Sequence, residues 1–253
     1  MKNSVARWRW GRAGRLLLVG TLVGLVTACS SEPSPSREEL RQQATSSAAE
    51  SRRDAEERKA RGLVERLTAV EGVEHVLTRL TDTCGMPSDG SLFDPQRPSD
   101  ALHCEIRTFT YVGVRGDVTA VLPRIKAAGI ADWGVRDGSG GDMPHAAGTV
   151  TYALDYHRGR GRDRDGGLLP APTLTAPGLR LDWDRPDLPL RYLAEEPTPC
   201  PAKGAHPYQR CETTPPSPGT VAAARARYGT VMVLELGGSG STAYGYYTVP
   251  RGG

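Results

Sequence analysis

The sequence predicts an α+β fold, in which a long N-terminal helix precedes about two helices packed on a mainly antiparallel, disulfide-stabilised sheet. Three observations lead to this prediction. Apolar residues recur three and four positions apart in two segments, as they do in helices with one buried face. Several shorter segments alternate apolar and polar residues between turn-rich stretches, as antiparallel strands do. Four cysteines form two pairs that are close in sequence.

The first predicted helix lies in a charged, alanine-rich segment, residues 37–61. The segment contains no Gly or Pro, and Leu40 is its single large apolar residue, so we expect a solvated helical stalk. An apolar stripe follows, made of Leu63, Leu67, Val70, Val73, Leu77 and Leu80. Two interpretations remain open for this stripe: one helix continues through residue 80, or a helix ends at Val70 and a strand begins at Val73.

The central part of the chain predicts a loop, a strand and a helix. Residues 84–103 are rich in Gly and Pro and are expected to form a loop. Residues 104–114 alternate, so each face of the predicted strand receives one set of side chains. One set is Ile106, Thr108, Thr110, Val112 and Val114, and the other is Arg107, Phe109 and Tyr111. Asp117 is expected to cap a helix that begins at Val118 and stops at Gly129.

Alternation then predicts three further strands. Residues 149–157, 179–183 and 188–193 each place apolar residues at every second position. Two glycine-rich segments separate them from their neighbours. Residues 137–142 are expected to form a flexible turn, and residues 158–167 a loop of mixed charge.

The last part of the chain predicts irregular structure, a short helix and a hairpin. Residues 197–218 are dense in Pro and are expected to be irregular. Residues 221–228 suit one or two helical turns. Residues 231–236 and 244–249 are rich in β-formers, and the Gly/Ser run at 237–241 between them favours a hairpin.

The start of the chain carries an export signature. Residues 1–28 begin with five basic side chains and no acidic one, and an apolar run, Leu16 to Val26, follows. This run is too short to span a bilayer and suits the core of a signal peptide. It leads into Val26-Thr27-Ala28-Cys29, which resembles the lipobox of bacterial lipoproteins. The resemblance implies that the Cys29 thiol receives a diacylglycerol and that Cys29 becomes the first residue after cleavage.

The resemblance also implies a domain organisation and a location. Residues 1–28 would be the signal peptide, and residues 29–36 the lipidated cysteine with a flexible Ser/Pro tether. The charged helical stalk would be residues 37–61, and the extracytoplasmic α+β domain residues 62–250. The protein is thus expected at the cell membrane, lipid-anchored on its extracytoplasmic face.

The four other cysteines are expected to form disulfides, because an exported chain matures in an oxidising compartment. They allow three connectivities, and we favour Cys84–Cys104 with Cys200–Cys211 because each pair is close in sequence. Chain entropy gives about 3 kcal/mol for each closed loop. A metal site is not expected, since the chain has no Cys-x-x-Cys and its five histidines are scattered.

Charge and residue usage restrict the partners. Without residues 1–28, the chain holds 27 Lys+Arg (32 less 5) against 29 Asp+Glu, a net charge of −2. This balance lacks the basic footprint of a nucleic-acid-binding protein, so no nucleic-acid partner is expected. Arginine makes up 28 of the 32 Lys+Arg, which is typical of a high-GC, actinobacterial genome.

Three local patterns resemble sites but fit simpler interpretations better. The run at 237–241 lacks the second glycine of a nucleophile elbow and the Gly-Lys-Ser/Thr ending of a phosphate loop, so we favour a turn. Asp163 and Asp165 supply only two acids of a calcium loop. The arginines near them could contact anionic lipid head groups or polymers, but the same acids halve the positive field. These arginines are Arg158, Arg160, Arg162 and Arg164, with Arg136 elsewhere.

Single residues offer two more candidates. His103 and His157 could each act as a general base, but neither has a nucleophile or carboxylate placed beside it by the sequence. Tyrosines near the end of the chain could form a sugar- or peptide-binding surface, although core filling in a chain with two phenylalanines explains them as well. They are Tyr244, Tyr246 and Tyr247.

The sequence therefore favours a non-enzymatic, membrane-anchored binding or interaction module of the cell envelope. We expect no catalytic residue, cofactor or metal. The partners would be the membrane, through the lipid on Cys29, and an envelope protein or glycan. The alternative is a cell-envelope hydrolase whose site is assembled from residues distant in sequence. An enzyme should gather titratable groups and a nucleophile in one cleft, whereas a binding module should expose an aromatic or apolar surface.

Overall fold

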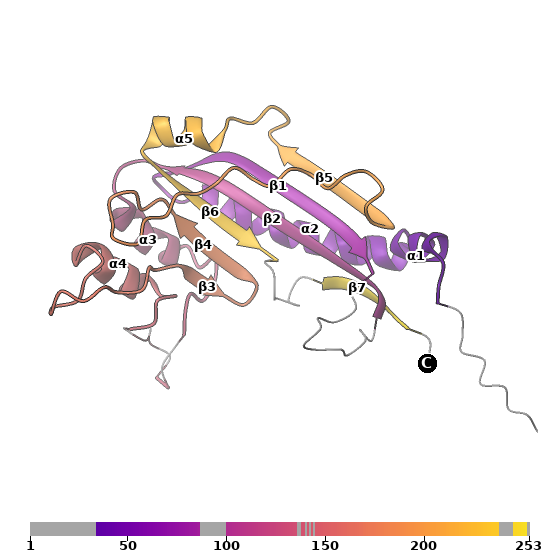
Figure 1. Ribbon diagram of the computed structural model, residues 1–253, viewed down its shortest axis with the longest axis horizontal. Helices are drawn as coiled ribbons and strands as arrows, with labels where there is room; N and C mark the ends of the chain where they lie inside the picture. Colours follow the sequence, from indigo (N-terminus) through magenta and orange to yellow (C-terminus); the bar gives the residue numbers. More distant parts are fainter. Residues whose placement is uncertain are drawn as a thin grey trace, which may run out of the picture. The chain divides into compact units, whose positions relative to one another are not determined.

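A seven-stranded antiparallel sheet organises the folded part of the chain (Figure 1). The computed structural model describes residues 34–86, 100–135, 138, 139, 141, 143, 145–237 and 245–251. These residues form five helices and one sheet, which confirms the α+β class. The expectations for Cys29, for the signal peptide and for most of residues 87–99, 137–142 and 237–244 lie outside the described residues.

The elements follow one another in a simple order. The helices are α1 (Arg37–Ala44), α2 (Ser47–Thr68), α3 (Val118–Ala127), α4 (Val150–Arg158) and α5 (Val221–Tyr228). The strands are β1 (Val73–Gly85), β2 (Asp100–Val114), β3 (Leu174–Ala176), β4 (Leu179–Trp183), β5 (Tyr208–Thr214), β6 (Thr230–Leu236) and β7 (Gly245–Pro250). Across the sheet the order is β3-β4-β6-β2-β1-β5, and β7 also pairs with β2.

One long N-terminal helix is not supported, and the segment is not a solvated stalk. The helix is interrupted at Thr45 and Ser46, between α1 and α2. The Ser46 side chain accepts a hydrogen bond from the backbone N–H of Ala49 and so caps α2. The buried residues of α1 and α2 lie mostly three to five positions apart: Leu40, Ala44, Ala49, Arg53, Ala60, Leu63 and Leu67. Alanine supplies little apolar area, but its small size lets the helices lie close to the sheet.

The stripe at residues 63–80 divides into a helix and a strand, as one of the two interpretations expected. α2 ends at Thr68, and Gly72 adopts a φ of +88°, a conformation that an L side chain rarely takes. β1 starts at Val73 and pairs antiparallel with β2 along its whole length. The chain therefore reverses onto the sheet at Gly72.

Strand β2 is the centre of the sheet, and its predicted alternation is confirmed. Its even-numbered residues from 102 to 114 include the buried Ile106 and Val112, while the odd-numbered Tyr111 packs in a different apolar cluster. β2 is long enough to pair with two strands, one after the other, along the same edge. β6 pairs with residues 108–114, and β7 pairs with residues 100–105.

Several further predictions are confirmed. Asp117 caps α3 by accepting the backbone N–H of Thr119, and Gly129 follows the helix with a φ of +60°. The strand at 179–183, the helix at 221–228 and the strand at 231–236 are present as β4, α5 and β6. Residues 158–167 form the expected loop of turns.

The predicted strand at residues 149–157 is wrong, because this segment is helix α4. The side chain of Thr149 accepts a hydrogen bond from the backbone N–H of Tyr152 and caps the helix. The buried residues Val150, Ala153 and Tyr156 are three positions apart and form the buried face of the helix. The segment also alternates apolar and polar residues, which is why it was predicted as a strand.

Three more predictions are wrong, all of them about which segments pair as strands. Residues 188–193 are not a strand, since only an isolated bridge joins Tyr192 to Arg185. Residues 208–214, expected to be irregular, form β5 because the edge of β1 offers them backbone partners. The predicted hairpin is absent: β7 pairs with β2 and not with β6.

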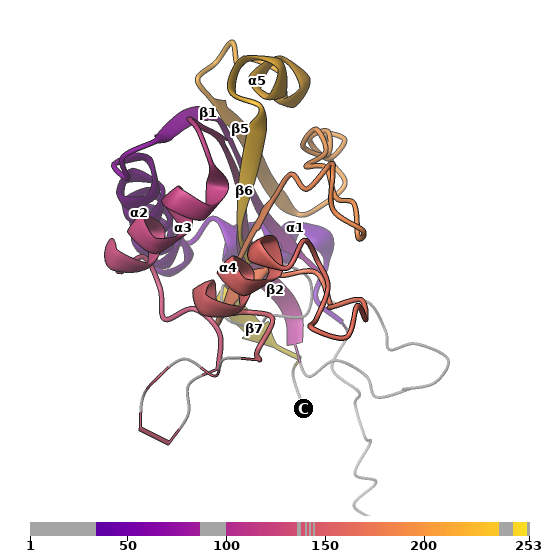
Figure 2. The same cartoon turned by 90° about the vertical axis from the view of Figure 1, so that its left-hand side faces the viewer.

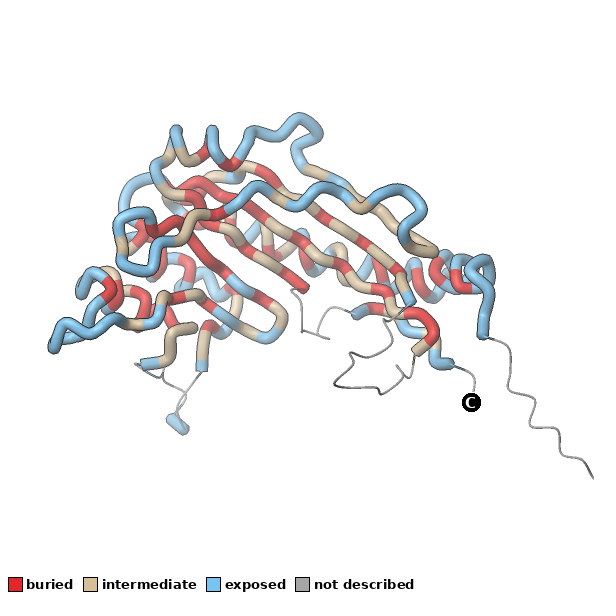
Figure 3. The backbone as a smooth tube through the Cα atoms, in the orientation of Figure 1, coloured by how far each residue is buried: buried red, intermediate tan, exposed pale blue. Residues whose placement is uncertain are grey.

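The helices lie mainly on one side of the sheet. Figure 2 shows α2 and α3 on one side and the segment after β4 on the other, with α5 at the end of β6. The largest apolar cluster joins α2, α3 and α4 to β2, β4 and β6, and a second surrounds α1 and β7. In Figure 3 the buried residues follow the central strands. The face that α2 does not cover is therefore the one left partly open.

Both predicted disulfides are present. Cys84 and Cys104 lie directly opposite each other in β1 and β2, with a Cα–Cα distance of 3.9 Å. Cys200 is joined to Cys211 of β5 with a Cα–Cα distance of 5.8 Å. The first bond is fully buried, and the second ties the proline-rich segment to the sheet edge.

Candidate functional site

The two candidate general bases, His103 and His157, each contact another side chain of the domain. His103 Nε2 is 4.0 Å from Glu105 Oε2 on β2. His157 is half-buried on α4, where its Nε2 accepts a hydrogen bond of 3.0 Å from Nε1 of Trp183. Among the described residues, neither histidine is hydrogen-bonded to a serine hydroxyl. The two are not brought together with a nucleophile in one cleft.

The partly buried His157 leads us to expect that the folded domain becomes less stable in acid. Burial and the nearby Arg185 lower the pKa of His157 from its ordinary value of 6.5. The unfolded chain therefore binds this proton more readily, and the free energy of unfolding should fall as the pH drops below 6.5. Protonating Nε2 would also break the bond from Trp183, a loss of about 1 kcal/mol. Urea unfolding at about pH 7 and about pH 5 measures the slope.

The comparison uses His157→Gln, which keeps an acceptor for Trp183 but does not titrate. We expect its stability to depend less on pH than that of the wild type. His145→Gln is the matched control, because His145 is exposed. Equal pH dependence in the wild type and in His157→Gln would contradict the assignment.

The acidic and arginine-rich loop is held by its own backbone. Asp163 Oδ1 accepts the backbone N–H groups of Asp165 and Gly167, at 3.0 and 2.7 Å. Arg162 donates to the carbonyl of Gly166, and Arg158 pairs with Asp155. In the described part of the chain, no three His, Cys, Asp or Glu side chains are grouped so as to hold a metal ion.

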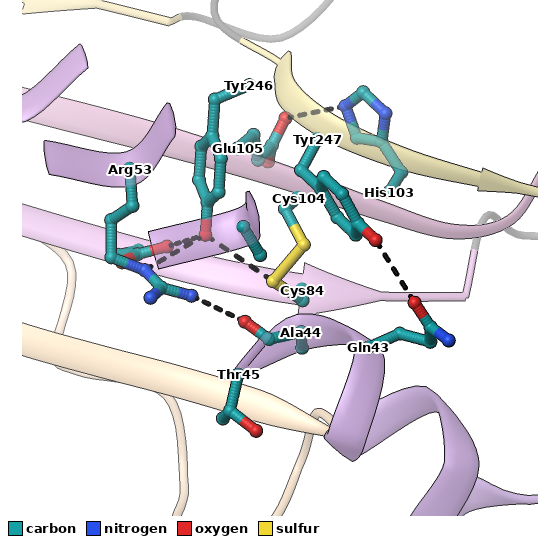
Figure 4. The surroundings of a disulfide bond; sticks show 12 residues. Gln43, Ala44, Thr45, Arg53, Cys84, His103, Cys104, Glu105, Tyr246 and Tyr247 are labelled. Atoms are coloured by element: carbon teal, nitrogen blue, oxygen red, sulfur yellow. Dashed lines mark hydrogen bonds and ion pairs between the residues drawn. A yellow bond between two sulfur atoms is a disulfide. The ribbon is translucent and has the colours of Figure 1, made fainter. Parts of the chain in front are cut away.

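Tyr246 and Tyr247 belong to the contact between β7 and the N-terminal helices. Tyr246 is 7% exposed, and Tyr247 donates a hydrogen bond of 3.1 Å to Gln43 Oε1 (Figure 4). This burial favours core filling over a ligand surface for Tyr246. Tyr244 lies outside the described residues.

The hydroxyl of Tyr246 sits in a buried ionic network beside the first disulfide (Figure 4). It donates to Asp82 Oδ1 at 2.8 Å and accepts from Arg53 Nε at 3.2 Å. Arg53 Nε also lies 2.8 Å from Asp82 Oδ2, and its Nη2 donates to the carbonyl of Ala44. Burial raises the pKa of Asp82, while the Tyr246 hydroxyl and Arg53 oppose this shift. The network joins α2, β1 and β7 and has a structural role.

A cavity of about 370 Å³ opens on the face of the sheet that α2 leaves uncovered. Its floor comes from three adjacent strands, β4, β6 and β2, and its wall from the segment after β4. The floor residues are Arg180, Asp182, Val233, Glu235, Phe109 and Tyr111, and the wall residues are Tyr192, Glu195, Glu196 and Thr198. The volume is within the range of small-molecule sites.

The charge of this cavity is unbalanced. Asp182 is neutralised by Arg185 at 2.6 Å and by Arg180 at 3.1 Å. In the described structure, Glu195 and Glu235 make no ion pair or side-chain hydrogen bond. Glu196 accepts one hydrogen bond, from the backbone N–H of Ala222 at the start of α5. The free carboxylates leave the cavity negative.

Tyr111 places an unpaired hydroxyl in the same cavity. The residue is 4% exposed, and its hydroxyl, which lies at the cavity, forms no hydrogen bond with any described residue. Burial, helped by Tyr192 and Glu196, raises the pKa of Tyr111 to about 12, so the hydroxyl keeps its proton at neutral pH. The hydroxyl is not among the buried side-chain atoms that lack a partner, so it is open to the cavity and accessible to a ligand group.

The wall of the cavity is fixed by Asp184, which immediately follows β4. The Asp184 carboxylate accepts the backbone N–H groups of Ala194 and Val231, at 2.7 and 3.0 Å. It also pairs with Arg225 of α5 at 2.8 Å. One buried carboxylate thus holds the wall segment, α5 and β6 together.

The sequence alone does not predict this cavity. Its floor lies on strands that are far apart in sequence, and its wall was predicted partly as a strand. One signal was available: Phe109 and Tyr111 occupy the face of β2 opposite the main apolar set. Two adjacent glutamates, Glu195 and Glu196, follow in the wall.

Two other cavities have different linings. One of about 250 Å³ lies between α2 and the sheet and is lined mainly by apolar and threonine side chains. The other, of about 950 Å³, lies between α1 and the Cys200–Cys211 loop and includes Arg37, Arg41 and Lys203. The 250 Å³ cavity includes the buried, unpartnered hydroxyl of Thr108, whereas the 370 Å³ cavity combines aromatic rings with free carboxylates and the Tyr111 hydroxyl, so we take the latter as the candidate binding site.

Comparisons with protein-family models, curated proteins and solved structures found no match to this chain. Within the described residues, no helix has both the length and the apolar character needed to cross a bilayer.

Proposed function

We propose that this protein is a lipid-anchored, extracytoplasmic lipoprotein whose α+β domain binds a ligand or partner of the cell envelope. The observation that carries the proposal is the distribution of its cysteines. Four of the five are paired in disulfides, as expected of a chain that folds in an oxidising compartment. The remaining one, Cys29, ends the sequence Val26-Thr27-Ala28-Cys29, which resembles a lipobox.

The cavity on the open face supports a binding role for the domain. It exposes aromatic rings and carboxylates on a floor of three paired strands, which hold their side chains in fixed positions. The tether at residues 29–36 would separate the domain from the lipid surface. A site on a sheet that is tethered to the membrane in this way is suited to capturing a ligand there.

The anchor is tested by following the lipid on Cys29. We expect cells fed an alkynyl fatty acid to label the wild-type protein, and intact mass to show a chain that begins at a diacylated Cys29. Two acyl chains suffice for stable attachment, whereas one binds only marginally. Cys29→Ala should lose essentially all of the label.

Ser31→Ala is the matched control, since it changes the tether but leaves the cysteine. It should be labelled as strongly as the wild type. Full labelling of Cys29→Ala, or a mature chain that begins elsewhere than Cys29, would refute the anchor.

A further inference from the structure

We propose that the 370 Å³ cavity binds an organic cation, a primary ammonium group on an alkyl stem such as a lysine-like side chain or a short diamine. The inference rests on the proposed function only in treating this cavity as the binding surface. It follows from the charge, the hydroxyl and the rings that face the cavity.

The carboxylates select a positive charge. Glu235 on β6 and Glu195 on the wall have no cationic partner within the described structure, and both line the cavity. Among the described lining residues the one cation is Arg180, which lies opposite Glu235 in the pairing of β4 with β6 but forms its ion pair with Asp182. An ammonium group between these carboxylates would gain charge-assisted hydrogen bonds, which are stronger than neutral ones.

The Tyr111 hydroxyl offers a third acceptor. It is protonated at neutral pH, so it remains uncharged and can accept a hydrogen bond on its oxygen. An ammonium group has three N–H donors. Two carboxylates and one hydroxyl would satisfy all three.

The apolar part of the floor suits the stem of such a ligand. Phe109 and Tyr111 of β2 lie on the same face as Val233 of β6, which pairs directly with Tyr111. An alkyl chain would cover these side chains while its charged end lies near the rings. A cation close to the face of an aromatic ring is attracted by the ring's quadrupole.

Other ligand classes fit less well. A metal ion lacks a group of three suitable side chains among the described residues. An anion would meet the free carboxylates, since Arg180 is engaged by Asp182. A neutral sugar could use the hydroxyl groups of Tyr111, Tyr192 and Thr198, but it would leave the charge of Glu195 and Glu235 without a counterion.

The experiment is a calorimetric titration of the full chain, in nonionic detergent, with 1,5-diaminopentane. The neutral analogue 1,5-pentanediol has a similar length and shape and serves as the matched probe. We expect the diamine to bind at least about tenfold more tightly than the diol, since a charge-assisted hydrogen bond contributes about 1.5–3 kcal/mol. Added salt should weaken the binding.

Two variants locate the binding. Glu235→Gln should weaken diamine binding about tenfold or more, and Tyr111→Phe by about threefold to tenfold. Glu50→Gln, an exposed change on α2, should leave it unaltered. If Glu235→Gln does not fold, Glu195→Gln on the exposed wall provides the same test.

Three outcomes would overturn the inference. The diamine and the diol could bind equally, the wild type could bind N-acetylglucosamine but not the diamine, or the two cavity variants could bind the diamine as the wild type does. These results are separate from the lipid labelling of Cys29. A labelled chain that does not bind the diamine would refute this inference alone, and an unlabelled chain that binds it would refute the anchor alone.

Discussion

Replacing Arg53 by methionine is expected to lower the free energy of unfolding by about 3–5 kcal/mol. Arg53 is 6% exposed and lies 2.8 Å from Asp82, which is completely buried. Without Arg53, the Asp82 carboxylate keeps the hydrogen bond from Tyr246 but loses its closest cation, since Arg210 is 3.9 Å away. Urea unfolding at neutral pH measures the change.

The control is Arg58→Met on the same helix. Arg58 is exposed, and Met and Arg have similar helix propensities, so this variant should stay within about 0.5 kcal/mol of the wild type. The double variant Arg53→Met, Asp82→Asn should recover part of the loss, because it removes the unpaired buried charge. Equal stability of Arg53→Met and Arg58→Met would show that the buried ion pair is not formed.

Replacing Asp184 by alanine is expected to destabilise the domain by at least about 3 kcal/mol. The change leaves the backbone N–H groups of Ala194 and Val231 without their acceptor, and it leaves Arg225 without its carboxylate. Each buried donor without a partner costs about 1–3 kcal/mol. Thermal and urea unfolding both report the loss.

Asp187→Ala is the matched control, because Asp187 is an exposed aspartate three residues away. It should change the free energy of unfolding by no more than about 0.5 kcal/mol. The wall of the cavity provides a second readout: in Asp184→Ala, binding of 1,5-diaminopentane should weaken together with stability. A stable Asp184→Ala variant would mean that this carboxylate does not fix the wall.

Local signals were sufficient for elements that a few neighbouring residues determine. Asp117 and Gly129 mark the two ends of α3 in the sequence, and both act there as expected. The disulfide pairs were predictable because each closes a short loop. The alternation of residues 104–114 was a reliable signal because one face of β2 is buried along the strand, while Glu105, Arg107 and Phe109 on the other face are only partly buried.

Tertiary contacts decided the elements that were predicted wrongly. Residues 208–214 carry no strong strand pattern, but they form β5 because β1 has an open edge beside them. Residues 149–157 alternate like a strand, yet the Thr149 cap and the packing of Ala153 in the core stabilise a helix. The candidate cavity depends on β4, β6 and β2 becoming neighbours, which no local pattern reports.

The position of β7 has a consequence for how this chain reaches its native state. Arg53 of α2 and Tyr246 of β7 are 193 residues apart, and the buried carboxylate of Asp82 needs both of them. Until residues 245–250 are available, the N-terminal helices would cover a charge whose partners are incomplete. Contacts of such long sequence separation slow folding. The largest apolar cluster contains no residue of β7, so we expect the end of the sheet around α1 and β7 to close after that cluster has formed. Under the export proposed above, this end of the domain would close only after the last strand has crossed the membrane.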